Sequence, residues 1–269
     1  MKELLPNQMH RIAPLFEGWD QTILWSCLQG YMGRAWADHL ERPVSARVLV
    51  GDFCFLAGRP NRELAEALPP ESQHFLLLIP REREWHSLIE RVHTGRCTQI
   101  LRYPFAKDTS GMDRERLQYY AGRIGTGYTI QAFDRSLYHQ AKQEAWSSDL
   151  CSQFPRWEDY RKHGIGFGAL WEGRLVSGAS SYTVYDGGIE IEIDTREDHR
   201  RKGLAAACAA RLILACLERG VMPSWDAHHL ASAALARKLG YRPQPPYIAY
   251  ERKNTPSSVP LTQDESHSW

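Results

Sequence analysis

The apolar and polar positions up to Phe105 alternate between a period typical of strands and a period typical of helices. Runs rich in β-branched and aromatic residues predict strands at three places: Ala46–Leu56 (one bent strand or two), His74–Pro80 and Cys97–Phe105. Helical spacing predicts three helices: Leu15–Leu40, Asn61–Leu68 and Arg81–Gly95. This alternation of strands and helices is typical of the α/β class.

The pattern restarts at Gly127 and predicts a second set of elements. A strand at Gly127–Asp134 is followed by two helical segments, Leu137–Ser147 and Arg156–Gly164. Phe167–Thr195 predicts three antiparallel strands, because Glu172-Gly173 and Asp186-Gly187-Gly188 are typical hairpin turns. The remaining elements are the apolar helix Leu204–Gly220, the strand Val221–Asp226, the helix Ala231–Gly240 and the strand Tyr247–Lys253.

This restart predicts two domains joined by a connector. We expect an N-terminal α/β domain at 1–112, a connector with one short helix at 113–127, a second domain at 128–253 and a disordered tail at 254–269. The segment Gly122–Gly127 (GRIGTG) has the glycine content of a phosphate loop. It precedes a strand instead of opening a helix, so we interpret it as a flexible joint.

Composition narrows the class of protein. The 269 residues include 33 basic and 32 acidic side chains, a net charge of +1, which argues against a nucleic-acid-binding protein. The six cysteines form no CxxC pair and no zinc spacing, so we expect reduced structural thiols and no metal site. No signal-peptide run or membrane-length apolar window is present, and we expect a cytoplasmic protein that does not contact membranes.

The segment Ile191–Gly220 predicts an anion-binding site. It consists of a strand, a short basic loop and an apolar helix, and the loop contains Arg200, Arg201, Lys202 and Gly203. The first turn of a helix carries unpaired N–H groups and the positive end of the helix dipole. A glycine lets the backbone approach a phosphate closely, so this loop is suited to a phosphorylated ligand.

The strand before that loop alternates strictly between apolar and acidic residues. Its two faces are Ile189, Ile191, Ile193 on one side and Glu190, Glu192, Asp194 on the other. If the acidic face lines a cleft, it attracts a cationic amine and can accept its proton, with Glu192 as the first candidate base and Glu190 as the second. The alternative is a solvent-facing side of an antiparallel sheet.

Two motifs resemble the Gcn5-related N-acetyltransferase superfamily. The sequence R-R-K-G-L-A matches its acetyl-CoA signature, [Gln/Arg]-x-x-Gly-x-[Gly/Ala], with Arg200, Gly203 and Ala205. A downstream stretch matches its second motif at His229, Ser232, Leu235, Ala236, Lys238, Leu239, Gly240 and Tyr241. The resemblance covers about Gly127 to Arg252. The overall length and the sequence RYPFAKD are similar to a bacterial two-domain subfamily that includes the zwittermicin resistance acetyltransferase.

The resemblance implies a fold and a reaction. The fold is an α/β (α+β) domain with a mixed, mostly antiparallel sheet flanked by helices, preceded by a smaller α/β domain that we interpret as a degenerate copy with no second cofactor site. The reaction moves an acetyl group from acetyl-CoA to the primary amine of a small, cationic molecule. The residues implied to hold acetyl-CoA are Ile193, Asp194, Thr195, Arg200, Arg201, Lys202, Gly203, Leu204, Ala205, His229 and Ser232.

Two departures from the family pattern leave the catalytic residues open. Ala236 stands where the family often has a tyrosine general acid, and His229 stands where it has asparagine. We expect Glu192, Glu190 and His229 to be the catalytic residues, since an imidazole can donate or accept a proton near neutral pH. The alternative is a catalytically weak CoA-binding sensor or protein-interaction module. We expect a monomer or a homodimer.

Three nearby polar residues have less specific interpretations. Asp226 precedes the predicted helix and is expected to cap it. His228 and His229 follow a strand end and could lie in a cleft or take a capping or surface role. His199 adjoins the basic loop and is expected to be exposed.

Overall fold

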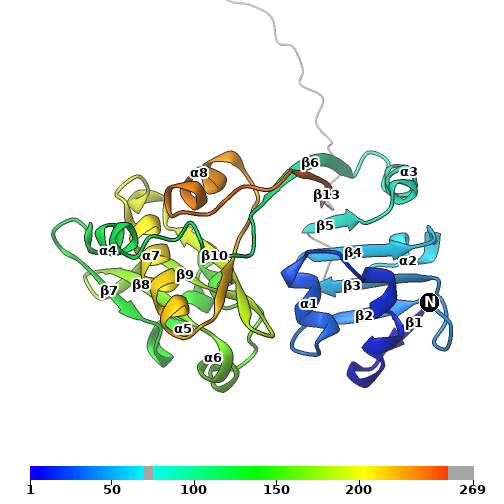
Figure 1. The fold of residues 1–269 in the computed structure, drawn as a ribbon, viewed down its shortest axis with the longest axis horizontal. Helices are drawn as coiled ribbons and strands as arrows, with labels where there is room; N and C mark the ends of the chain where they lie inside the picture. The colour runs from blue at the N-terminus through cyan, green and yellow to red at the C-terminus, as the bar shows by residue number, and fades with distance from the viewer. Residues whose placement is uncertain (70–74, 254–269) are drawn as a thin grey trace, which may run out of the picture.

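Two sheets with flanking helices form the two halves of the protein in the computed structural model, which describes residues 1–69 and 75–253 (Figure 1). Among these residues the first sheet has the strand order β1-β2-β3-β4-β5-β13-β6-β12, and the second has the order β11-β10-β9-β8-β7. The predicted tail at 254–269 lies outside the described residues. None of the described helices is long and apolar enough to cross a bilayer.

The elements have the following bounds. The first sheet contains β1 (Lys2–Leu4), β2 (Arg34–Ala37), β3 (Ser45–Val50), β4 (Phe53–Gly58), β5 (Phe75–Pro80), β6 (Cys97–Pro104), β12 (Asp226–Ala227) and β13 (Tyr247–Lys253). The second contains β7 (Tyr128–Ala132), β8 (Gly166–Trp171), β9 (Arg174–Tyr185), β10 (Gly188–Thr195) and β11 (Met222–Ser224). The α-helices are α1 (Thr22–Leu28), α2 (Arg62–Glu66), α3 (Arg83–Val92), α4 (Arg114–Gly122), α5 (Arg135–Gln143), α6 (Trp157–His163), α7 (Leu204–Glu218) and α8 (Leu230–Lys238).

The predicted α/β class is confirmed, and one predicted helix is wrong. Leu15–Leu40 contains only the short helix α1, and its end forms strand β2. Gly30 and Gly33 lie between them in the left-handed region, at φ of 81° and 87°. A β-carbon on Gly33 would lie 2.6 Å from the Leu49 carbonyl oxygen. These glycines therefore end the helix and let the chain turn into the sheet.

The two halves share one order of elements. In each, four antiparallel strands are followed by a helix and by a strand parallel to the fourth, so β4 pairs with β5 as β10 pairs with β11. In the second half, α7 packs against β8, β9 and α4, and most of its side chains are buried. A helix that is apolar on nearly all faces is stable in such a position, between a sheet and another helix.

The last strands of the two halves are exchanged. β13 lies between β5 and β6 and is antiparallel to both, while β6 also pairs with β12. Figure 1 shows β6 and β13 running together between the two halves. The predicted domain boundaries stay a prediction, and a cut between them would separate β13 from both of its neighbours.

A buried ion pair lies where these strands cross. Arg102 on β6 donates from Nε to Asp226 Oδ1 at 3.0 Å, and their side chains are only 4% and 10% exposed. Tyr247 on β13 donates its hydroxyl to the other oxygen of Asp226 at 2.6 Å. The expectation that Asp226 caps the following helix is therefore wrong, because its carboxylate joins β6, β12 and β13 instead.

Removal of this carboxylate is expected to destabilise the protein strongly. Asp226→Ala leaves the buried guanidinium of Arg102 without its ion-pair partner, so the free energy of unfolding should fall by about 3–5 kcal/mol. The control is Asp159→Ala, which removes the exposed Arg156–Asp159 pair and should cost less than about 1 kcal/mol. Urea unfolding measures both, and equal losses would contradict the role of the buried pair.

Candidate active site

The second sheet opens at the boundary between β10 and β11. β11 pairs with β10 only from Gly188 to Glu190, whereas β10 continues to Thr195. The Arg196 N–H donates to the Val176 carbonyl, and the alternation of an antiparallel ladder then turns the N–H groups of Ile193 and Thr195 away from β9. Among the described strands none pairs with this edge. The N–H groups of Ile193 and Thr195 donate to the neighbouring carboxylates of Glu192 and Asp194, at 3.2 and 2.8 Å, and an extended ligand that binds this edge has to replace these local contacts.

The first half closes the corresponding position. β4 pairs with β5 as far as Leu56, and two side chains from the start of α3 cover the end of β4. Glu82 accepts the Gly58 N–H at 3.0 Å, and the Trp85 indole donates to the Gly58 carbonyl at 2.9 Å. The open strand edge is therefore a feature of the second half.

The basic loop positions the N-terminus of α7. Gly203 has a φ of 84°, and the first helical hydrogen bond runs from the Ala207 N–H to the Gly203 carbonyl. The N–H groups of Leu204, Ala205 and Ala206 therefore have no acceptor within the helix. Leu204 anchors this turn, because its side chain is buried in the core. The turn presents its N–H groups as an anion-binding site.

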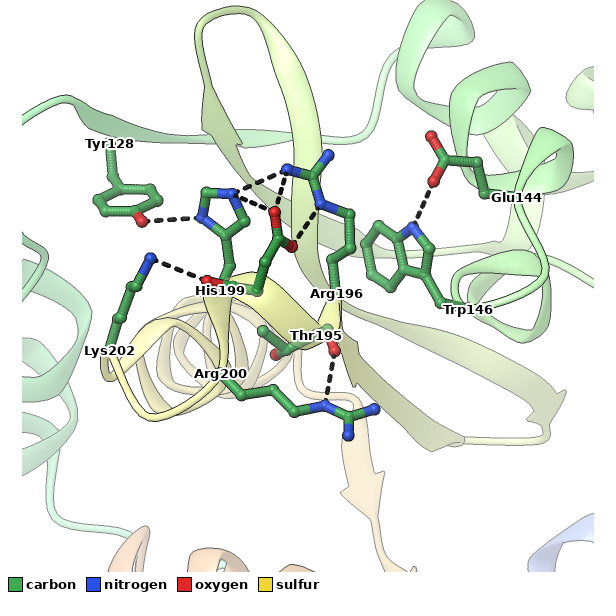
Figure 2. A network of polar contacts seen from close by, with 9 residues as sticks. Tyr128, Glu144, Trp146, Thr195, Arg196, His199, Arg200 and Lys202 are labelled. Carbon is green, nitrogen blue, oxygen red and sulfur yellow. Dashed lines mark hydrogen bonds and ion pairs between the residues drawn. The ribbon is translucent and has the colours of Figure 1, made fainter.

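A network around His199 holds the loop in place (Figure 2). The Arg196 guanidinium donates to His199 Nε2 at 2.8 Å and forms an ion pair with Asp198. Because Arg196 can only donate, the neutral ring carries its proton on Nδ1, which lies 2.8 Å from the Tyr128 hydroxyl. The expectation of an exposed His199 is wrong. It is 6% exposed, its ring packs near Trp171, and burial lowers its pKa.

The structure separates the predicted basic residues into two places. Arg200 turns back along β10 and donates to the Thr195 carbonyl at 3.2 Å, away from Lys202 (Figure 2). Arg201, Lys202 and Gly203 instead line a cavity beside the N-terminus of α7. Arg200 therefore binds the end of the open edge at Thr195, and the loop from Arg196 to Gly203 leads from this edge to the N-terminus of α7.

An acidic cavity of about 330 Å³ lies beside β10, along the stretch from Glu190 to Ile193. Both halves of the protein line it, and its charged groups are the carboxylates of Asp52, Asp149, Glu190, Glu192 and Asp226 with the guanidinium of Arg102. Its remaining polar lining includes Tyr182, His228, His229 and Ser232. Among residues 1–69 and 75–253, no group of three His, Cys, Asp or Glu side chains is arranged to hold a metal ion.

The predicted alternation of β10 is retained. Ile189 and Ile191 belong to the hydrophobic core that contains α7, and Ile193 packs against this core, whereas Glu190 and Glu192 line the acidic cavity. The register with β9 shifts between Glu190 and Ile191 because β9 carries one extra residue there, Tyr182. Asp194 lies outside this lining, and its carboxylate accepts the Thr195 N–H at 2.8 Å. The acidic residues therefore do not form a solvent-facing side of the sheet.

Burial raises the pKa of two carboxyl groups of the cavity, Glu190 and Glu192, so that both are partly protonated near neutral pH. It raises the pKa of Glu192 to about 8, and Asp149 and Asp194 add to this effect. Burial also raises the pKa of Glu190 to about 7, with a further contribution from Asp226, although the Thr22 hydroxyl donates to it. A cation that enters the cavity favours the ionised forms, so either group can accept a proton near neutral pH.

His229 and Ser232 lie at the start of α8. His229 Nδ1 accepts the Ser232 N–H at 3.1 Å, so His229 caps the helix and its neutral ring carries the proton on Nε2. Ser232 accepts a hydrogen bond from the Trp225 indole at 3.1 Å. His229 is thus both a helix cap and part of the cavity lining, and Ala236 is fully buried on the same helix.

Sequence patterns did not reveal two acidic residues of the cavity. Asp52 lies in the turn between β3 and β4, and Asp149 lies in the 3-10 turn Ser148–Leu150. Burial, with a contribution from Asp149, raises the pKa of Asp52 to about 6. Gly51-Asp52 is recognisable as a hairpin turn, but nothing in the local sequence shows that this turn meets the second half.

The raised pKa of Glu192 predicts a pH-dependent gain of stability in Glu192→Gln. Between the unfolded value of 4.5 and the folded value of about 8, the folded protein binds a proton that the unfolded chain does not. Wild-type stability is therefore lost as the pH rises through this window, and glutamine avoids the loss. Melting curves should show similar stability at pH 5 and a gain of about 2–4 kcal/mol at pH 9.

The control for this experiment is Glu158→Gln, at an exposed glutamate on α6. Its stability relative to the wild type should not vary with pH. An equal difference between Glu192→Gln and the wild type at pH 5 and pH 9 would contradict the buried environment of Glu192.

Comparisons with known proteins identify the family of this chain. The family model described as GNAT acetyltransferase matches residues 13–250. An uncharacterized N-acetyltransferase of Bacillus subtilis (strain 168), YdfB, is 36% identical over 270 residues, which cover 93% of this chain and 98% of the relative. The crystal structure of a GCN5-related N-acetyltransferase-like protein from Streptococcus suis is 44% identical, has a TM-score of 0.87, and covers 92% of this chain and 99% of its own.

A more distant structure supports the arrangement of two similar halves. A tandem GNAT protein from the clavulanic acid biosynthesis pathway is 12% identical, with a TM-score of 0.50, and 84% of each chain is covered. This likeness shows the fold alone. The predicted fold is confirmed, and so is the prediction that the protein is an acyltransferase. The family therefore favours an enzyme over the alternative of a CoA-binding sensor. The chain belongs to the GNAT acetyltransferase family and is an N-acetyltransferase.

Proposed function

We propose that the protein transfers an acetyl group from acetyl-CoA to the primary amine of a small cationic molecule. One observation carries this proposal: the open edge of β10 connects an anion site at the N-terminus of α7 with an acidic cavity. The family supplies the reaction class. The two ends of this groove differ in charge, as an anionic donor and a cationic acceptor require.

The donor would bind along the loop and the strand edge. The N–H groups of Leu204 to Ala206 and the side chain of Arg201 are suited to the diphosphate. The backbone groups of Ile193 and Thr195 would pair with the amides of the pantetheine arm, which replace the Glu192 and Asp194 carboxylates as acceptors of these N–H groups. An N–H of this edge can also polarise the thioester carbonyl, as donors in an oxyanion hole do.

The acceptor would bind among the carboxylates of the acidic cavity. Its ammonium group loses a proton to Glu192, with Glu190 as the second candidate, and the free amine attacks the carbonyl carbon. The new C–N bond forms and the C–S bond breaks, and the second proton that the attacking nitrogen loses passes through water to the leaving thiolate. Ala236 offers no phenol for this last step. The Nε2–H of His229 can stabilise the leaving thiolate through a hydrogen bond while Nδ1 caps α8.

Acetyl-CoA is expected to raise the melting temperature of the wild type and not that of Gly203→Glu. A ligand at 100 times its dissociation constant stabilises by about 2.7 kcal/mol, which is roughly 5–10 °C here. A glutamate at 203 brings negative charge to the helix N-terminus. The control is Gly220→Glu, because Gly220 also has positive φ and open space around it but follows the other end of α7. An unchanged shift in Gly203→Glu would contradict the donor site.

Glu192→Gln is expected to lower kcat by about 100-fold or more while the affinity for acetyl-CoA is unchanged. The wild-type kcat/KM should rise with pH up to the pKa of the base, about 8 in the free enzyme, and then level off. Steady-state rates with diamines and with neutral hydroxyl compounds as acceptors measure both effects. Acetylation of only the neutral compounds would contradict the cationic acceptor.

A further inference from the structure

A basic cavity of about 370 Å³ lies between α4, the loop before α7 and α8. Its charged lining consists of Arg123, Arg201, Lys202 and Lys238, and no carboxylate is part of this lining. Within the described residues none of these four side chains forms an ion pair. The whole chain has almost equal numbers of acidic and basic groups, so this uncompensated positive charge is local.

Aromatic rings of α4 hold two of these cations. The Lys238 Nζ lies 4.6 Å from the centre of the Tyr120 ring, and Tyr120 also lines the cavity. The Arg123 guanidinium lies 5.5 Å from the Tyr119 ring and donates to the Tyr119 hydroxyl. Cation–π contacts position a positive charge without neutralising it, unlike contacts with carboxylates. The cations therefore remain available to an anion.

The cavity is continuous with the N-terminus of α7. Gly203 and Ala206 belong to its lining, and a β-carbon built on Gly203 would lie 3.7 Å from the Arg123 carbonyl oxygen. A ligand on the N–H groups of this turn can thus extend toward Arg123 and Lys238. Arg123 comes from the segment Gly122–Gly127 of the connector, which the sequence pattern predicted to be a flexible joint.

We propose that this basic cavity binds the 3′-phosphate of CoA and so selects CoA over 3′-dephospho-CoA. The inference rests on the proposed function. CoA carries a diphosphate and a separate 3′-phosphate on its ribose. The N–H groups of α7 accommodate the first, and Arg123, Lys238 and their neighbours provide charge for the second. The connector helix α4 is then part of the donor site.

Calorimetric titration with CoA and with 3′-dephospho-CoA tests the proposal. The wild type should bind CoA at least about tenfold more tightly, a difference that one charge-assisted contact can supply. The double variant R123Q/K238Q should bind both ligands with equal affinity and keep the wild-type affinity for 3′-dephospho-CoA. Arg237→Gln is the matched control, because Arg237 is exposed, adjoins Lys238 and does not line the cavity. It should keep the preference.

A charge-retaining variant separates charge from folding. R123K/K238R should restore most of the preference, and melting curves verify that every variant is folded. Equal binding of CoA and 3′-dephospho-CoA by the wild type would overturn this inference and leave the proposed function standing. An equal loss of affinity for both ligands in R123Q/K238Q would also overturn it. Binding of neither ligand by the wild type would instead overturn the proposed function.

Discussion

The site depends on the point at which β11 leaves β10. Strands β10 and β11 are parallel neighbours for three residue pairs, and then β10 continues to Thr195 without a partner on that side. Backbone N–H and C=O groups are obligatory hydrogen-bonding groups, and here the side chains of Glu192, Asp194 and Arg200 bind this edge in place of a strand. The same divergence leaves space for the acidic cavity and leads the chain into the N-terminus of α7. Strand pairing thereby fixes where donor and acceptor would meet.

The first half of the chain contributes to the site although its own strand edge is closed. Asp52 reaches the acidic cavity from the turn between β3 and β4, Phe53 reaches it from the start of β4, and Arg102 reaches it from β6. The exchange of β6 and β13 joins the two sheets, and Asp226 fixes this crossing through Arg102 and Tyr247. The two halves are therefore a single structural unit around the cavity.

The sequence predicted the local parts of this arrangement. Three antiparallel strands, the basic loop and the apolar helix α7 follow from hairpin glycines and periodicity, and the motif Arg200 to Ala205 indicated the family. Tertiary contacts decided the rest. The burial of His199 depends on Tyr128 and Trp171, Glu192 shares its cavity with Asp52 of the first half, and the partner of Asp226 lies on β6. None of these contacts has a signature within a window of neighbouring residues.

Amide hydrogen exchange with and without acetyl-CoA tests the central claim most directly, because it observes the open strand edge itself. The account predicts slower exchange at the N–H groups of Ile193 and Thr195 and at those of Leu204 to Ala206, while Gly58 at the closed edge of β4 is unchanged. Slower exchange at other positions, with the β10 edge and the α7 N-terminus unaffected at saturating acetyl-CoA, would contradict the account.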